Sequence, residues 1–280
     1  MTRSFTQPVT ASESANTAID LKSPGWRVVA VQECRDLWVS ARGLLLVFVY
    51  SVLLSAITYL AATNQILNFL EQREAVNLTL QVSVAIGVLV VLVVSADAIS
   101  GERERGTLES LLLTPVSRRG IAAGKVAAAM SLWFAAWLVS VPYVWILGRG
   151  VRIVGEALLL SLLVGTLLGL GLSAVGILIS AASTSNKVSL SASLFLLLAL
   201  FAPSQLPTAT THAGFSEVLL RLNPIASVLH YMSAVLARGH GWTADWSYLV
   251  SALALVVLAG GALIVTAPRT IRLAGGVSGG

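Results

Sequence analysis

Most of the side chains that could do chemistry lie in one polar stretch of an otherwise apolar chain. The 280 residues include 18 basic and 13 acidic side chains, and nearly a third of these lie between residues 95 and 125. Glu102, Arg103, Glu104 and Arg105 alternate in sign, and Glu109 follows. Such a segment can receive force from a cytosolic partner. A solvated loop, whose charges only keep it in the cytosol, would have the same composition.

A nucleotide or metal site is not expected in this chain. A phosphate-binding loop needs the pattern Gly-x4-Gly-Lys-Ser/Thr, whose backbone amides hold the phosphates. The nearest match has Arg119 in place of the first glycine and Val126 after Lys125. One cysteine and three histidines give no metal-ligand spacing, and the scattered basic residues form no nucleic-acid patch. We therefore expect the chain itself to bind no cofactor and no nucleic acid.

A serine nucleophile is the alternative from another class of protein. The tetrapeptide Gly171-Leu172-Ser173-Ala174 lies within an apolar run and superficially resembles that of rhomboid intramembrane proteases. A serine nucleophile needs a base within hydrogen-bonding reach, which in that family is a histidine of the last span. The last apolar run here contains no histidine, and His240 precedes it by several residues.

The composition places these residues in a membrane protein. Hydrophobic residues make up 56% of the chain and charged residues 11%, whereas a soluble domain carries about 25% charge. A helix that crosses the bilayer needs about 20 mostly apolar residues. Six stretches qualify, and the fold class we expect is therefore an all-α integral membrane protein. The predicted spans are Leu44–Ala62, Leu80–Ile99, Ile121–Leu147, Ala157–Ala182, Val188–Leu206 and Trp246–Ala267.

The basic residues set the orientation, because Lys and Arg are retained in the cytosol. With the N-terminus inside, most of the 18 basic residues are cytosolic. The outer ones are then Arg73, Arg149, Arg152, Arg221 and Arg238. We predict a multi-pass protein of the cell membrane with both termini in the cytosol.

Three segments outside the spans have their own character. Residues 1–25 are polar and are predicted to form a disordered cytosolic tail. Ala30, Cys34, Leu37, Trp38 and Ala41 recur at helical spacing, which predicts an amphipathic helix over residues 26–42 in the cytosolic membrane interface. Residues 214–237 are predicted to form two short amphipathic helices on the outer side, with Asn223-Pro224 starting the second.

The charged stretch contains residues that end and start helices at defined places, as in a rigid element. We call it the coupling segment (residues 100–119). The second span is expected to continue through the Glu-Arg pairs and to end at Gly106, in a left-handed conformation. Thr107 can then cap a helix of about two turns that has Leu108 on its apolar face. Pro115 ends this helix, and Ser117 can cap the third span.

The segment Glu102–Arg118, ERERGTLESLLLTPVSR, closely resembles the signature of the type-2 permeases of ABC transporters, the membrane subunits of an exporter superfamily. The stretch ECRDLWVSAR at residues 33–42, the six spans and the outer Leu222-Asn223-Pro224 strengthen the resemblance. It implies that the segment docks on an ATPase subunit. The implied contact residues are Glu102, Arg103, Glu104, Arg105, Gly106, Thr107, Leu108, Glu109, Pro115 and Arg118.

The resemblance also implies the partners. Two ATPase subunits would hold ATP and Mg²⁺, and a second permease, either another copy or a homologue, would complete the translocation path. The inner loop with Ser185, Asn186 and Lys187 is a candidate second ATPase contact.

A path for substrate leaves only weak signals in the sequence. Ser180, Ser189 and Ser193 could line a polar route, although serines in membrane helices also bond to the backbone. Gly165 and Gly169 permit close helix packing, either within the chain or between two permeases. No predicted span has a charge at its centre, as a gradient-driven carrier would need.

With neither a nucleotide site nor an ion relay, the chain needs energy from elsewhere. We expect a permease subunit of an ATP-driven exporter. The alternatives are the serine hydrolase above and a membrane receptor or scaffold that does not transport.

Overall fold

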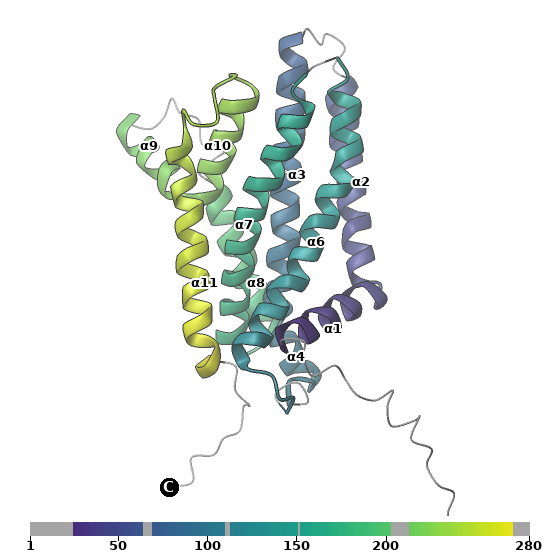
Figure 1. Cartoon of the computed structure of the whole chain (residues 1–280), viewed down its shortest axis with the longest axis vertical. Helices are drawn as coiled ribbons and strands as arrows, with labels where there is room; N and C mark the ends of the chain where they lie inside the picture. Colours follow the sequence, from purple (N-terminus) through teal and green to yellow (C-terminus); the bar gives the residue numbers. More distant parts are fainter. Residues whose placement is uncertain (1–24, 64–68, 110–112, 151, 203–212, 271–280) are drawn as a thin grey trace, which may run out of the picture.

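The computed structural model describes residues 25–63, 69–109, 113–150, 152–202 and 213–270, and all regular elements in these ranges are helices (Figure 1). The tail at residues 1–24 lies outside the described residues. Within these ranges, five helices are long and apolar enough to cross a membrane. They are α2 (Arg42–Thr63), α3 (Phe69–Asp97), α6 (Arg118–Leu147), α7 (Val154–Ala182) and α11 (Val250–Thr270), the last extended by the 3-10 helix η3 (Trp246–Leu249).

The predicted fifth span corresponds to α8 (Asn186–Phe201), which at 16 residues is shorter than a full crossing. The remainder of this prediction, up to Leu206, falls partly outside the described residues. The helical membrane fold is confirmed, and the count of six spans stays a prediction.

Helices α3 and α7 form the centre of the bundle, and α6 packs against both. The sequence allows this because glycines face large side chains. A Cβ atom added at Gly165 would lie 2.1 Å from the ring of Trp133, and one at Gly87 would lie 2.6 Å from the same ring. Trp133 is 1% exposed and fills the space between α3 and α7. Gly165 therefore serves packing within the chain, as does Gly169, which faces Met130.

Helix α1 (Gly25–Val39) lies obliquely across one end of the bundle, next to α6 (Figure 1). Val29 is buried, and a Cβ at Gly124 of α6 would approach it to 2.6 Å. Cys34 and Trp38, from the predicted apolar face, are half-buried, and the Trp38 indole donates to Ser131 at 3.2 Å. Ala41 is exposed and lies past the end of the helix at a φ of 63°.

Two further helices, α9 (Ala213–Leu222) and α10 (Pro224–Leu236), lie at the far end of the bundle from α1 (Figure 1). The side chain of Asn223 accepts hydrogen bonds from the amides of Ile225 and Ala226, at 3.0 and 3.1 Å. The predicted cap of α10 is therefore confirmed. His230 and Tyr231 belong to this helix, which is buried along most of its length.

Candidate functional site

The coupling segment begins where the helix is interrupted, which the sequence did not predict. We expected the second span to run on to Gly106, but α3 ends at Asp97 and a separate helix, α4 (Ser100–Arg105), follows. The Ser180 hydroxyl accepts hydrogen bonds from the amides of Ile99 and Ser100, at 3.0 and 2.9 Å. These amides are satisfied from α7, so the helix can end there without leaving buried donors unpaired.

Two more serines complete this junction. Ser100 and Ser189 both donate to the carbonyl oxygen of Ala96, at 2.9 and 2.7 Å. Ser180 and Ser189 are fully buried and thus bond to the backbone around the break. Ser193 is also buried, and its hydroxyl has no hydrogen-bond partner within the described residues. The role of these serines in a translocation path stays a prediction.

The end of α4 matches the prediction. Gly106 has a φ of 70°, the left-handed conformation that ends helices, and its amide bonds back to Arg103. Thr107 donates its hydroxyl to the Glu102 carbonyl, at 3.4 Å.

Beyond Gly106 the coupling segment combines one anchor with an exposed surface. Leu108 is 4% exposed and packs with Ile177 of α7 and Leu263 of α11. By contrast, Leu113 is 84% exposed, and the side chains of Glu109 and Pro115 are also exposed. Leu108 and Glu109 are helical, and residues 110–112 of the expected short helix lie outside the described residues.

The two candidate ATPase contacts are joined to each other. Glu104 accepts a hydrogen bond of 2.9 Å from the amide of Asn186, at the start of α8. Arg103 donates to the carbonyl oxygens of Ser183 and Ala181, at the end of α7. The loop with Ser185, Asn186 and Lys187 and the helix α4 therefore form one structural unit.

A buried ion cluster connects α4 to two other helices. The ammonium of Lys125, on α6, lies 2.5 Å from Glu102 of α4 and 2.6 Å from Glu33 of α1. The Lys125 side chain is 2% exposed. Burial raises the pKa of Glu102 above its usual 4.5, and the Lys125 charge opposes this shift. These three residues are far apart in the chain, so their spacing in the sequence does not indicate that they pair.

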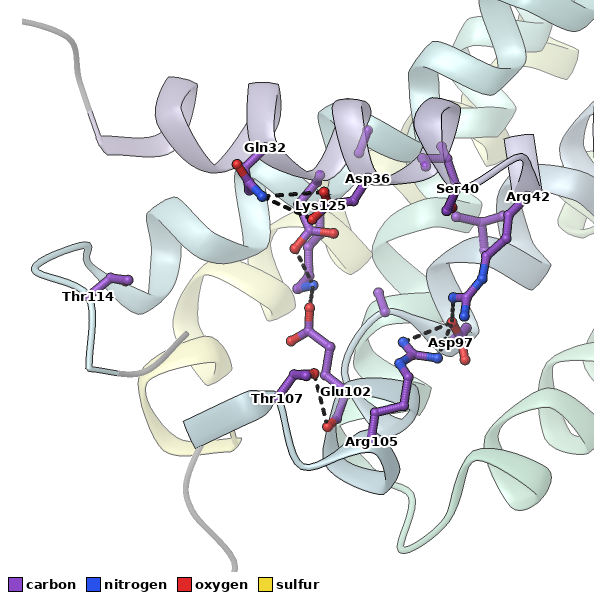
Figure 2. A pocket seen from close by; sticks show the side chains of 15 residues that line it. Gln32, Asp36, Ser40, Arg42, Asp97, Glu102, Arg105, Thr107, Thr114 and Lys125 are labelled. Atoms are coloured by element: carbon purple, nitrogen blue, oxygen red, sulfur yellow. Dashed lines mark hydrogen bonds and ion pairs between the residues drawn. The ribbon is translucent and has the colours of Figure 1, made fainter. Parts of the chain in front are cut away.

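A second ion cluster surrounds Asp97, at the end of α3. Arg105 of α4 and Arg42 of α2 lie 3.4 and 3.9 Å from its carboxylate, and Asn186 donates to it at 2.7 Å. The two clusters lie on opposite sides of one cavity of about 570 Å³ (Figure 2). The charged segment of the sequence thus forms one wall of a cavity that carries both ion clusters.

The other end of the coupling segment is also tied down. The Ser117 hydroxyl accepts from the Gly120 amide at 3.1 Å, which confirms the predicted cap of α6. Arg118 donates to the carbonyl of Pro268 at 2.9 Å, and Arg119 donates to that of Ile264 at 3.1 Å. Both carbonyls belong to the last two turns of α11, where cations are favourable.

The serine and histidine side chains that a hydrolase would need form hydrogen bonds in separate parts of the bundle. Ser173 is fully buried and donates to the carbonyl of Leu170. His230 contacts Arg238, and His240 bonds to Asp245, both at the far end of the bundle. Within the described residues, no group of three or more His, Cys, Asp or Glu side chains is arranged to hold a metal ion.

The fold and this site define a class: a helical membrane protein whose long spans carry a braced, charged segment at one end. The comparison with known families is more specific. The family model described as ABC-2 family transporter protein matches residues 27–267, and the chain belongs to this family. It is therefore a multi-pass membrane permease subunit of an ABC transporter, a kind of subunit that pairs with an ABC ATPase. A search of curated proteins gave no match.

Proposed function

We propose that the chain is the permease of an ATP-driven exporter, in which two separate ATPase subunits hydrolyse ATP and a second permease completes the translocation path. The observation that carries this proposal is the exposed coupling segment, held in place by buried anchors. Leu108 packs in a cluster with residues of α7 and α11, while the side chains of Glu109 and Leu113 are exposed.

The anchors provide a route for force. A push on the coupling segment passes through Glu102 to Lys125 on α6, and through Glu104 to the start of α8. The break at Ile99 lets α4 turn relative to α3, because hydroxyl groups rather than a continuous helix hold it there. We infer that closure of the ATPase pair moves α4 with the ends of α6 and α8, and opens a path between the two permeases.

The orientation follows from the same assignment. Because the ATPases are cytosolic, the end of the bundle with α1 and α4 faces the cytosol, and α9 and α10 lie on the outer side. The unequal distribution of Lys and Arg in the sequence supports this orientation. ATP and Mg²⁺ bind the ATPase subunits, and no step of the hydrolysis uses residues of this chain.

The first test is a charge reversal on the exposed surface. Glu109→Lys should release the ATPase from the purified complex, or abolish the dependence of ATP hydrolysis on the permease. Its matched control is Glu217→Lys, a reversal at an exposed residue of α9 at the far end. Glu104 is less suitable, because its carboxylate also holds the amide of Asn186.

The outcome separates the candidate functions. A P-loop ATPase that co-purifies with the wild type and the control, but not with Glu109→Lys, supports the permease assignment. If all three proteins purify without ATPase activity, the receptor or scaffold alternative replaces it. Hydrolytic activity that Ser173→Ala removes would instead favour the serine hydrolase.

A further inference from the structure

The cavity between α1 and α4 separates charges of opposite sign. On one side, Arg42 and Arg105 share the single carboxylate of Asp97, which leaves one positive charge in excess. On the other side, Glu33 and Glu102 share the single ammonium of Lys125, which leaves one negative charge in excess. Figure 2 shows the two groups apart, with the cavity between them.

Both sides of the cavity have hydrogen-bonding groups that a ligand could still use. The side chains of Arg42 and Arg105 are 59% and 41% exposed, and a guanidinium has five donors, of which Asp97 occupies only some. Asp36 follows Glu33 by one helical turn, lines the same cavity and adds a further carboxylate. It accepts from the side-chain amide of Gln32 at 3.1 Å, which occupies only part of its acceptor capacity. A dipolar cavity of this kind favours a dipolar ligand, because an ion of either sign alone would meet one repulsive wall.

The spans place the cavity at headgroup depth. The candidate span of α2 begins at Arg42, and that of α3 ends at Asp97. The hydrophobic segments therefore stop where the cavity is, and lipid headgroups occupy this level of a bilayer. The volume of about 570 Å³ also lies in the range of small-molecule sites.

We propose that this cavity binds the headgroup of a zwitterionic aminophospholipid, with its phosphate at Arg42 and Arg105 and its primary ammonium at Glu33 and Asp36. An ethanolamine headgroup matches both sides, since its ammonium donates hydrogen bonds to carboxylates. A choline headgroup has no N–H donor, and a glycerol headgroup has no cation. The site requires no ATPase, so it stands independently of the proposed transport function.

The test is native mass spectrometry of the full-length chain in detergent. The protein is mixed with equal amounts of dioleoyl phosphatidylethanolamine, phosphatidylcholine and phosphatidylglycerol. We expect the ethanolamine lipid to bind about tenfold more tightly than the other two, the effect of one charge-assisted contact. Asp36→Asn should reduce this preference to about twofold, because only the primary ammonium distinguishes the ethanolamine lipid. Arg42→Gln should weaken the binding of all three lipids, whose phosphate is the same, whereas Arg42→Lys, which retains the charge, should keep most of it.

The matched control is Arg35→Gln, which removes the same charge from an exposed residue of α1 outside the cavity. This variant should bind like the wild type. Equal binding of the three lipids, a preference that survives Asp36→Asn, unchanged binding in Arg42→Gln, or an equal loss in Arg35→Gln would each overturn the proposal. A further arm adds soluble phosphoethanolamine. Displacement of the lipid at equal concentration would assign the site to a soluble ligand and overturn the lipid assignment.

Discussion

Lys125→Met removes the cation that holds three helices together. The ammonium is 2% exposed and lies within 2.6 Å of two carboxylates. Without it, Glu33 and Glu102 face each other without a counter-charge. Breaking a buried ion pair by removal of one partner costs about 3 kcal/mol or more. For a chain of this size, we expect the apparent Tm to fall by about 6 to 10 °C.

The pH dependence of this loss has a defined sign. Burial raises the pKa of Glu102 in the folded chain, and the neighbouring Lys125 charge limits the rise. In Lys125→Met that pKa rises further. The group then favours the folded state at pH below its unfolded value near 4.5, and this contribution is lost as the pH rises through the folded pKa. The destabilisation of Lys125→Met should therefore be larger at pH 7.5 than at pH 5.

The assay is thermal unfolding in detergent, followed by tryptophan fluorescence. Lys187→Met, the same change at an exposed lysine at the start of α8, is the control and should leave the Tm within about 1 °C. The triple variant Lys125→Met with Glu33→Gln and Glu102→Gln removes all three charges and should recover most of the stability. An unchanged Tm in Lys125→Met, or a loss just as large in the triple variant, would refute the reasoning.

Three further predictions concern the rest of the bundle. Gly165→Ala places a methyl group 2.1 Å from the Trp133 ring and should lower the free energy of unfolding by about 2 kcal/mol. Gly260→Ala, the control, meets open space and should cost almost nothing. Thermal unfolding of the two variants measures the difference. Asn223→Ala removes the α10 cap and should cost about 1 kcal/mol, seen as faster hydrogen exchange in that helix. Burial lowers the pKa of His230, so α10 should lose stability as the pH falls below the usual 6.5. His230→Gln should abolish this pH dependence. Unchanged hydrogen exchange of α10 at pH 5.5 in the wild type would contradict the prediction.

Local features of the sequence predicted much of the fold. Gly106, Ser117 and Asn223 end or start helices as expected, because the deciding groups lie within a few residues of each other. Apolar runs of sufficient length identified the long spans for the same reason. In these places the residue type and its immediate neighbours carry the whole physical cause.

The features missed in the sequence depend on distant residues. The break between α3 and α4 needs Ser180, whose hydroxyl comes from a helix 80 residues further along the chain. The contact of Glu33 with Lys125 spans 92 residues and requires α1 to cross α6 in one register. Close passage at Gly124 sets that register, and the sequence shows this glycine without showing what it faces.

The indole of Trp133 restricts how the bundle can move. Its ring fills the gap between Gly87 of α3 and Gly165 of α7, so α6 cannot rotate about its own axis without driving the ring into a neighbouring backbone. We therefore expect the three central helices to shift together as one block. The elements left to move relative to this block are α4 and α8, which receive the push on the coupling segment, and α2, which exposes most of its surface. Any motion of substrate past this protein would then take place along the margins of the block rather than through its middle.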